Sequence, residues 1–158
     1  KTTLLKSILG LIPAFKGSCE RGENLELGYF EQEVKGDNKT TCIEELLQAF
    51  PSYTQYEIRS ALAKCGLTTK LIESQVRVLS GGEQAKVRLC KLMNRETNVL
   101  LLDEPTSNVD SINEGIILKA LKEQKNKKSI ILVSHRESTM AIADRIYKVD
   151  CGVMTEEA

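Results

Sequence analysis

The sequence lacks long apolar runs, net charge and regularly spaced cysteines, and each absence removes a class of protein. No apolar run approaches the roughly 20 residues that a membrane-spanning helix needs, which argues against a transmembrane segment. A formal net charge of zero leaves no nucleic-acid-binding signature spread over the chain. The five cysteines show no C-x-x-C spacing and there is one histidine, so a reduced, cytoplasmic protein is favoured over a zinc site or a disulfide framework.

What is present is enough for one domain with a hydrophobic core, since 41% of the 158 residues are hydrophobic. The stretch from Ser80 to Glu83 has the features of a helix start that can hold an anion. Ser80 and Glu83 have the spacing of a capping box, with Ser80 as the N-cap. Gly81 and Gly82 carry no Cβ, so a phosphate can approach the backbone N–H groups at the positive end of the helix dipole. Taken alone, this pattern is also typical of an ordinary surface helix.

A buried strand is predicted over residues 99–102, followed by two carboxylates. Four consecutive apolar residues suit a parallel sheet covered on both faces, and ligands of such sheets bind beyond the carboxyl ends of the strands. Asp103 and Glu104 lie at that end, and Pro105 stops the strand. Because successive side chains point to opposite faces, Asp103 can hold Mg²⁺ while Glu104 accepts a proton from an attacking water. For this dipeptide alone, two solvated acids are the alternative.

Together these stretches resemble a known family. The run LSGGE at 79–83, the run LLLDEPT at 100–106 and Asp110, four residues after Thr106, are similar to the signature, Walker B and D-loop motifs of ATP-binding cassette (ABC) ATPase domains. The resemblance covers essentially the whole chain. It implies an α/β fold of the P-loop NTPase type, with a mostly parallel sheet flanked by helices and an inserted ABC helical subdomain at about 40–95.

The start of the chain, Lys1, Thr2 and Thr3, matches the last residues of a P-loop, which reads G-x-x-x-x-G-K-[ST]. The sequence is therefore expected to be a fragment that begins inside this motif, with the upstream strands and the Walker A glycines missing. The resemblance implies that Lys1 reaches the β- and γ-phosphates of ATP. It also implies that Thr2, Asp103 and Gln32, the glutamine of the Q-loop, support Mg²⁺.

The same resemblance assigns the chemistry of ATP hydrolysis. Glu104 corresponds to the general base, and His135, directly after the strand predicted at 129–134, corresponds to the switch histidine that contacts the γ-phosphate. ABC domains work as head-to-tail pairs, so the residues from Ser80 to Glu83, with Asp110, are expected to close on ATP held by a second ABC domain. The full-length parent is expected to be an ATPase, and the isolated chain to be inactive.

The rest of the sequence predicts alternating strands and helices around a helical insertion. Helices are expected at 1–11, after the capping boxes Thr41–Glu44 and Thr54–Glu57, at 70–73, from Asp110 or Ser111, and at 138–143. Further strands are expected at about 25–29, at 129–134, where the run is apolar enough to be buried, and at 145–150, followed by a turn at 151–152.

Three functions remain open within this family. Residues 83–93, 1–10 and 28–33 are similar to the ABC-F branch, whose members are soluble tandem ATPases that act on the ribosome. The D-loop departs from the usual T-N-H-L-D of that branch, because Ser107 follows Thr106, as in transporters. An ABC-F-like translation factor, the ATPase subunit of a transporter with a membrane permease, and a non-catalytic fragment that pairs with other domains are the alternatives.

Overall fold

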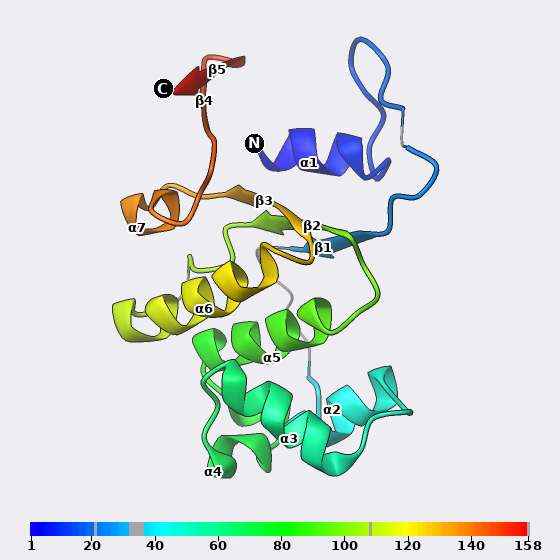
Figure 1. Ribbon diagram of the computed structural model, residues 1–158, viewed down its shortest axis with the longest axis vertical. Coiled ribbons are helices and arrows are strands. Elements are labelled where there is room, and N and C mark those ends of the chain that lie inside the picture. Colours follow the sequence, from blue (N-terminus) through cyan, green and yellow to red (C-terminus); the bar gives the residue numbers. More distant parts are fainter. Residues whose placement is uncertain (21, 32–36, 108, 158) are drawn as a thin grey trace.

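The computed structural model describes residues 1–20, 22–31, 37–107 and 109–157. Figure 1 shows its elements around a small sheet. The helices are α1 (Thr2–Ile8), α2 (Cys42–Ala49), α3 (Gln55–Lys64), α4 (Thr69–Ile72), a 3-10 turn η1 (Val76–Val78), α5 (Gly81–Met93), α6 (Ser111–Gln124) and α7 (Glu137–Met140). The strands are β1 (Leu27–Phe30), β2 (Val99–Asp103), β3 (Ser129–Val133), β4 (Ile146–Asp150) and β5 (Val153–Glu157).

The central sheet is parallel, in the order β1-β2-β3. Strand β2 is the middle strand, and its apolar residues are buried as the unbroken run of hydrophobic residues predicts. In register, Gly28 pairs with Leu100 and Leu100 pairs with Ile130. The strands therefore end together, on the edge where Asp103 terminates β2. The predicted α/β fold with a parallel sheet between helices is confirmed.

The two faces of the sheet are covered by different helices (Figure 1). Helix α1 lies against β2 on one face, and α5 contacts β1 and α6 on the other. On the α5 face the packing is close: a Cβ added to Gly28 would lie 2.8 Å from Cδ1 of Leu92. A side chain at this position of β1 would push α5 away from the sheet, which explains why glycine occupies it.

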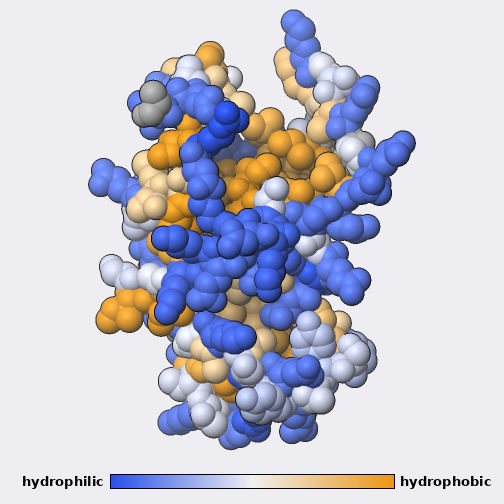
Figure 2. Space-filling view, viewed as in Figure 1, coloured by the Kyte–Doolittle hydropathy of each residue, from blue (hydrophilic) through white to orange (hydrophobic). Residues whose placement is uncertain are grey.

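Strand β3 is less buried than its sequence predicts. It lies at the edge of the three-stranded sheet, and Ile131 keeps 48% of its surface exposed. The prediction of a fully buried strand at 129–134 is wrong because α1 contacts β2, so Ile131 is left uncovered. Leu4 and Leu11, in and after α1, are exposed as well. Figure 2 shows hydrophobic residues gathered over this part of the molecule, while the opposite end, formed by α2 to α4, is mostly hydrophilic.

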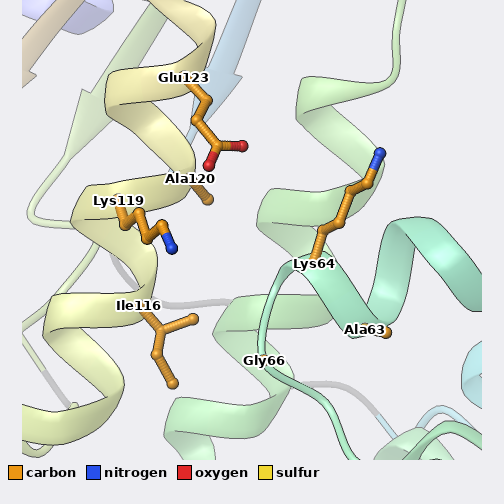
Figure 3. A pocket seen from close by; sticks show the side chains of 7 residues that line it. All are labelled: Ala63, Lys64, Gly66, Ile116, Lys119, Ala120 and Glu123. Carbon is orange, nitrogen blue, oxygen red and sulfur yellow. The ribbon is translucent and has the colours of Figure 1, made fainter.

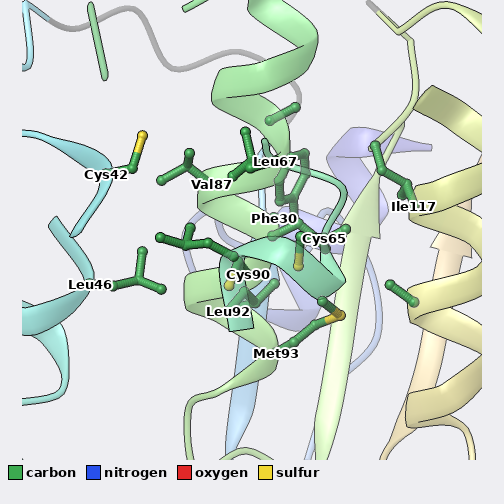
Figure 4. Packing of buried hydrophobic residues seen from close by; sticks show 14 of the residues in the cluster. Phe30, Cys42, Leu46, Cys65, Leu67, Val87, Cys90, Leu92, Met93 and Ile117 are labelled. Carbon is green, nitrogen blue, oxygen red and sulfur yellow. The ribbon is translucent and has the colours of Figure 1, made fainter. Parts of the chain in front are cut away.

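In the helical unit formed by α2, α3 and α4, the first two helices begin at capping boxes that can be recognised in the local sequence. Thr41 and Thr54 each accept a hydrogen bond from the backbone N–H of a glutamate three residues on, and each glutamate reaches back to the cap, so both predicted capping boxes are confirmed. The unit packs on α5 through one hydrophobic cluster (Figure 4). Its labelled members are Phe30, Cys42, Leu46, Cys65, Leu67, Val87, Cys90, Leu92, Met93 and Ile117.

The cysteines divide into two groups. Cys42, Cys65 and Cys90 are buried in the cluster, whereas Cys19 and Cys151 are exposed, and all five are free thiols. Burial raises the pKa of Cys42 to about 11. The contact with Cys65, followed by burial, raises the pKa of Cys90 as well. Cys42 and Cys90 therefore stay protonated near neutral pH, and all three buried thiols pack as small apolar side chains.

The end of the described chain forms an element that the sequence did not predict. Strand β4 pairs with β5 in an antiparallel hairpin, and the two residues of its turn, Cys151 and Gly152, have φ angles of 46° and 82°. Two successive positive φ angles are typical of a two-residue hairpin turn. The turn at 151–152 was predicted, but the returning strand was not. None of the helices in the described residues combines the length and the hydrophobicity needed to span a bilayer.

Candidate nucleotide site

Two parallel strands bring a carboxylate and an imidazole together at the carboxyl edge of the sheet. Glu104 follows β2 and His135 follows β3, and Nε2 of His135 lies 3.3 Å from Oε1 of Glu104. The side chain of Glu104 is 25% exposed, and that of His135 is 69% exposed. The pair therefore faces solvent from one side, where a reacting group can reach it.

The backbone of Glu104 is in an uncommon conformation. Its φ angle of 47° lies in the left-handed region, which residues other than glycine rarely adopt. Two hydrogen bonds hold it there: the N–H of Glu104 donates to the carbonyl of Val133 at 3.0 Å, and the N–H of Ser107 donates to the carbonyl of Glu104 at 3.1 Å. The turn after β2 is thus tied to the end of β3, and the carboxylate is aimed by backbone strain.

Asp103 is buried, and its carboxylate has no hydrogen-bond partner in the part of the chain that the structure describes. Its exposed fraction is 1%, and among the described residues the buried side-chain polar atoms without a partner are its two carboxylate oxygens and the hydroxyl oxygen of Tyr29. A buried carboxylate without partners is unfavourable unless it meets a cation or a hydrogen-bond donor. The oxygens of Asp103 therefore fit a magnesium site, since Mg²⁺ prefers carboxylate and water oxygens.

Tyr29 also belongs to this site. From the sequence, it was predicted only as part of the strand at about 25–29. The register pairs Tyr29 with Leu101, so Tyr29 and Asp103 lie on the same face of adjacent strands, two residues out of register. Burial, and then the nearby charge of Asp103, raise the pKa of Tyr29. The alternation of side chains along β1 could have placed Tyr29 on this face only if the pairing register had been known.

Helix α1 presents the first residues of the chain to the same face of the sheet. Lys1 is the N-cap of this helix without a side-chain capping bond, and Thr2 and Thr3 form its first turn. Within the described residues, no hydrogen bond or ion pair joins these three side chains to Asp103 or Glu104. Gln32, the predicted Q-loop residue, lies outside the described residues.

The end of β1 is held by helices on both of its sides. Lys6 of α1 donates to the carboxylate of Glu31 at 3.0 Å, and this hydrogen bond raises the pKa of Lys6. Arg88 of α5 donates to the carbonyl of Glu31 at 3.3 Å, and its guanidinium lies 4.7 Å from the ring centroid of Phe30. Burial lowers the pKa of Arg88. The residue before Gln32 is thereby fixed between α1 and α5.

The predicted signature forms the N-terminus of α5 as expected. Ser80 is the N-cap and Glu83 completes a capping box, which confirms the predicted helix start. Gly82 is buried, but a Cβ added to Gly81 would meet nothing within 4 Å. Gly81 therefore opens onto free space, so no contact within this chain requires a glycine there.

A narrow crevice connects the start of α5 with the end of β2. It is lined by Phe30, Gly81, Ala85, Arg88, Glu104, Pro105, Ser107 and Val109. Asp110, the predicted D-loop aspartate, follows and caps α6 by accepting hydrogen bonds from the N–H groups of Ile112 and Asn113, both at 3.1 Å. These bonds, first among them that from Asn113, lower the pKa of Asp110.

A hollow larger than this crevice lies away from the strand ends. It is a groove of about 340 Å³ between the end of α3 and helix α6, and it contains none of the predicted site residues. Figure 3 shows Gly66 and Lys64 on one side of this groove and Ile116, Lys119 and Glu123 on the other. The structure thus brings Asp103, Glu104 and His135 together at the strand ends, and the crevice that Gly81 and Glu104 both line is separate from the groove.

Comparisons with known proteins agree with this geometry. The sequence model of the family described as "ABC transporter" matches residues 1–107. The Bacillus subtilis (strain 168) protein "Uncharacterized ABC transporter ATP-binding protein YfmM" is 66% identical over 135 residues, which are 85% of this chain and 26% of that protein. "ABC transporter F family member 2" of Arabidopsis thaliana is 35% identical over 159 residues, covering 98% of this chain and 23% of that protein.

A solved structure shows the same fold. It is titled a dimeric, post-hydrolysis ATP-binding cassette bound to ADP and Pi, and it superposes with a TM-score of 0.78 at 18% identity, covering 98% of this chain and 79% of that one. The chain spans about a quarter of the length of the two curated relatives. Because the family match includes the helix start at Ser80 and the carboxylates after β2, this chain belongs to the ABC transporter family.

Proposed function

We propose that this chain binds Mg-ATP and hydrolyses it as part of an ABC-type ATPase. The observation that carries the proposal is the end of β2, where the buried, unpartnered carboxylate of Asp103 adjoins the Glu104–His135 pair. A buried carboxylate whose oxygens lack hydrogen-bond partners suits a cation, and a partly exposed carboxylate beside an imidazole suits proton transfer. Such a combination supports hydrolysis of a metal-bound phosphate ester or anhydride.

Each site residue has a role in this proposal. Asp103, with Thr2 and Gln32, would hold Mg²⁺, whose charge would offset that of the phosphates. Lys1 and Thr3, at the start of α1, would contact the phosphates. Glu104 would accept the proton of the attacking water, and His135 would orient the γ-phosphate. A positioned base accelerates such a step by roughly 10²–10⁴-fold.

The signature residues act on a nucleotide held by another domain. Gly81 opens onto free space and the N-terminus of α5 points outward, which suits a ligand supplied from outside this chain. The ATP-binding cassette of the solved relative is dimeric by its title. We infer that Ser80 to Glu83 and Asp110 face the nucleotide of a second ABC domain arranged head to tail, in the same or another chain.

The substitution Glu104→Gln tests this function in the full-length protein. It removes the proton acceptor but keeps the shape of the side chain, so we expect ATP binding to persist while the steady-state hydrolysis rate falls at least about 100-fold. Glu123→Gln, on the exposed face of α6, is the matched control and should retain normal activity. Near-normal hydrolysis by the Glu104→Gln protein would exclude Glu104 as the base.

We further propose that the full-length protein belongs to the ABC-F branch and acts on the ribosome. Residues 83–93 resemble that branch, and an "ABC transporter F family member" of Arabidopsis thaliana is similar over nearly the whole chain. With hydrolysis blocked by Glu104→Gln, the full-length protein should co-sediment with ribosomes in the presence of ATP. Co-purification with a membrane permease, without ribosomes, would instead assign it to a transporter.

A further inference from the structure

Arg136, the residue after His135, forms hydrogen bonds with the turn that follows Glu104. Its guanidinium donates to the carbonyl of Ser107 at 3.3 Å and to the carbonyl of Val109 at 3.2 Å. It also donates to the carboxylate of Glu114 on α6 at 2.7 Å. One side chain from the end of β3 thus holds both the turn and the helix that follows β2.

Glu114 is the centre of this arrangement. It is buried, and besides Arg136 it accepts hydrogen bonds from Ser138 at 2.8 Å and from Thr106 at 3.3 Å. Burial alone would raise its pKa, but the hydrogen bonds from Ser138 and Arg136 outweigh burial and lower it. Glu114 is therefore a charged, fully partnered side chain that joins α6, the turn after β2 and the start of α7.

A second cation, this one buried, is linked to the same segment from α5. Lys86 of α5 is 2% exposed, and its amino group donates to the carbonyl of Gly66 at 3.0 Å and to the side-chain oxygen of Asn113. Asn113 in turn donates to the carboxylate of Asp110 at 2.5 Å. Figure 3 shows Gly66 facing Ile116 of α6 across the groove. The helical unit, α5 and α6 therefore meet at Lys86.

We propose that Arg136 and Lys86 are positioning residues that clamp the described residues of the segment 105–113, Arg136 from the end of β3 and Lys86 from α5, and so keep Glu104 and His135 in register. The proposal rests on the proposed ATPase function for its catalytic consequence. Within the described residues no hydrogen bond or ion pair joins either side chain to those of Glu104 and His135, so both act through the segment that they hold.

The clamp has a specific consequence for Glu104. Its left-handed backbone is kept by the bond from the Ser107 N–H, and Ser107 is kept in place through its carbonyl by Arg136. Without Arg136, the strained conformation loses this support, and Glu104 can relax away from His135. Without Lys86, Asn113 and Asp110 lose the link to the helical unit.

The test uses the full-length protein with Arg136→Gln and Lys86→Met. The matched controls are Arg145→Gln, at the exposed residue directly before β4, and Lys119→Met, on the surface of α6. We expect kcat for ATP hydrolysis to fall about tenfold in both clamp variants, while KM for ATP stays within about twofold of the wild type. Arg136→Lys should recover only part of kcat, because an amine keeps the charge near Glu114 but lacks the planar fork of donors with which Arg136 reaches Glu114 and both carbonyls.

Hydrogen exchange without nucleotide gives a second, activity-independent readout. Peptides containing the Ser107 and Val109 amides should exchange about tenfold faster in Arg136→Gln, whereas amides of β2 should not change. Unchanged exchange in this region, or an equal loss of protection in β2, would overturn the clamp. A wild-type protein that does not hydrolyse ATP would overturn the proposed function instead, and faster exchange confined to this segment would then leave the clamp as a structural device only.

Discussion

A buried carboxylate normally has hydrogen-bond donors around it, and Asp103 has none among the described residues. The hydroxyl of Tyr29 lacks a partner at the same place, on the adjacent strand. Two unsatisfied groups that share one face weaken the nucleotide-free protein. We propose that they gain partners when a ligand with cationic and donor atoms binds, so that at the scale of single residues the site favours ligand binding over stability.

The substitution Tyr29→Phe tests separately how the hydroxyl affects the stability of the nucleotide-free protein and how it affects nucleotide binding. Because the Tyr29 hydroxyl has no hydrogen-bond partner among the described residues, its removal should leave the midpoint of thermal unfolding of the nucleotide-free protein unchanged or slightly raised. If the hydroxyl donates to Asp103 or its ligands when Mg-ATP binds, the affinity for Mg-ATP should fall about tenfold. Tyr147→Phe, at an exposed position of β4, is the matched control. A lower midpoint without nucleotide would show that the hydroxyl has a structural partner.

Residues whose partners are close in sequence could be predicted, and those with distant partners could not. The capping boxes at Thr41, Thr54 and Ser80 span three residues each, and all three are present. By contrast, Arg136 and Glu114 are 22 positions apart, and only the pairing of β2 with β3 brings them together. Nothing in the dipeptide His135–Arg136 indicates that the arginine turns back to the segment after β2.

At the scale of elements, the junction between α3 and α6 depends on Gly66. Its φ angle of 77° favours glycine, and a Cβ there would lie 2.7 Å from Cγ2 of Ile116. The close approach lets the carbonyl of Gly66 accept from Lys86. The helical unit therefore reaches α6 through a residue that has no side chain.

Gly66→Ala and Gly152→Ala form a matched pair for this junction. Both glycines have positive φ angles, so both substitutions add backbone strain of about 1 kcal/mol. Only the Cβ at Gly66 meets a neighbour, whereas the one at Gly152 meets nothing within 4 Å. Gly66→Ala should therefore lower the midpoint of thermal unfolding of the full-length protein more than Gly152→Ala does. Equal midpoints would mean that Ile116 moves aside without loss.

The presence and type of the elements could be predicted better than the residues at which they end or the depth to which they are buried. The apolar run of β2 identifies a central strand, because a middle strand needs apolar side chains on both faces. The run of β3 is equally apolar but lies at an edge, and burial there depends on which elements cover it. The first helix was expected at 1–11 and occupies Thr2–Ile8, since Gly10, with a φ angle of 71°, ends it early.

At the scale of the whole molecule, hydrophobic surface remains exposed around α1 and β3 (Figure 2). The chain spans about a quarter of the length of the two curated relatives named above, so we propose that the full-length protein contributes further segments, among them the glycine loop. Lys1 supplies only a charge at the rim of such a loop, whereas most contacts to phosphate come from its consecutive N–H groups.

We therefore expect the 158-residue chain alone to bind Mg-ATP poorly and not to hydrolyse it. Loss of even a few charge-assisted hydrogen bonds, each about 1.5–3 kcal/mol, lowers affinity by several powers of ten. Titration calorimetry of the chain alone and of the full-length protein measures the difference. Micromolar binding by the chain alone would show that the residues described above hold the nucleotide without the glycine loop.

Because two cysteines are exposed and three are buried, the reactivity of the thiols can report on conformational change. A thiol reagent added to the native protein at neutral pH meets Cys19 and Cys151 first, because both side chains are exposed. Cys42, Cys65 and Cys90 react only when the contact between the helical unit and α5 opens, since they lie in the cluster that joins them. The rate at which these thiols become modified thus measures how often the helical unit separates, without any introduced label.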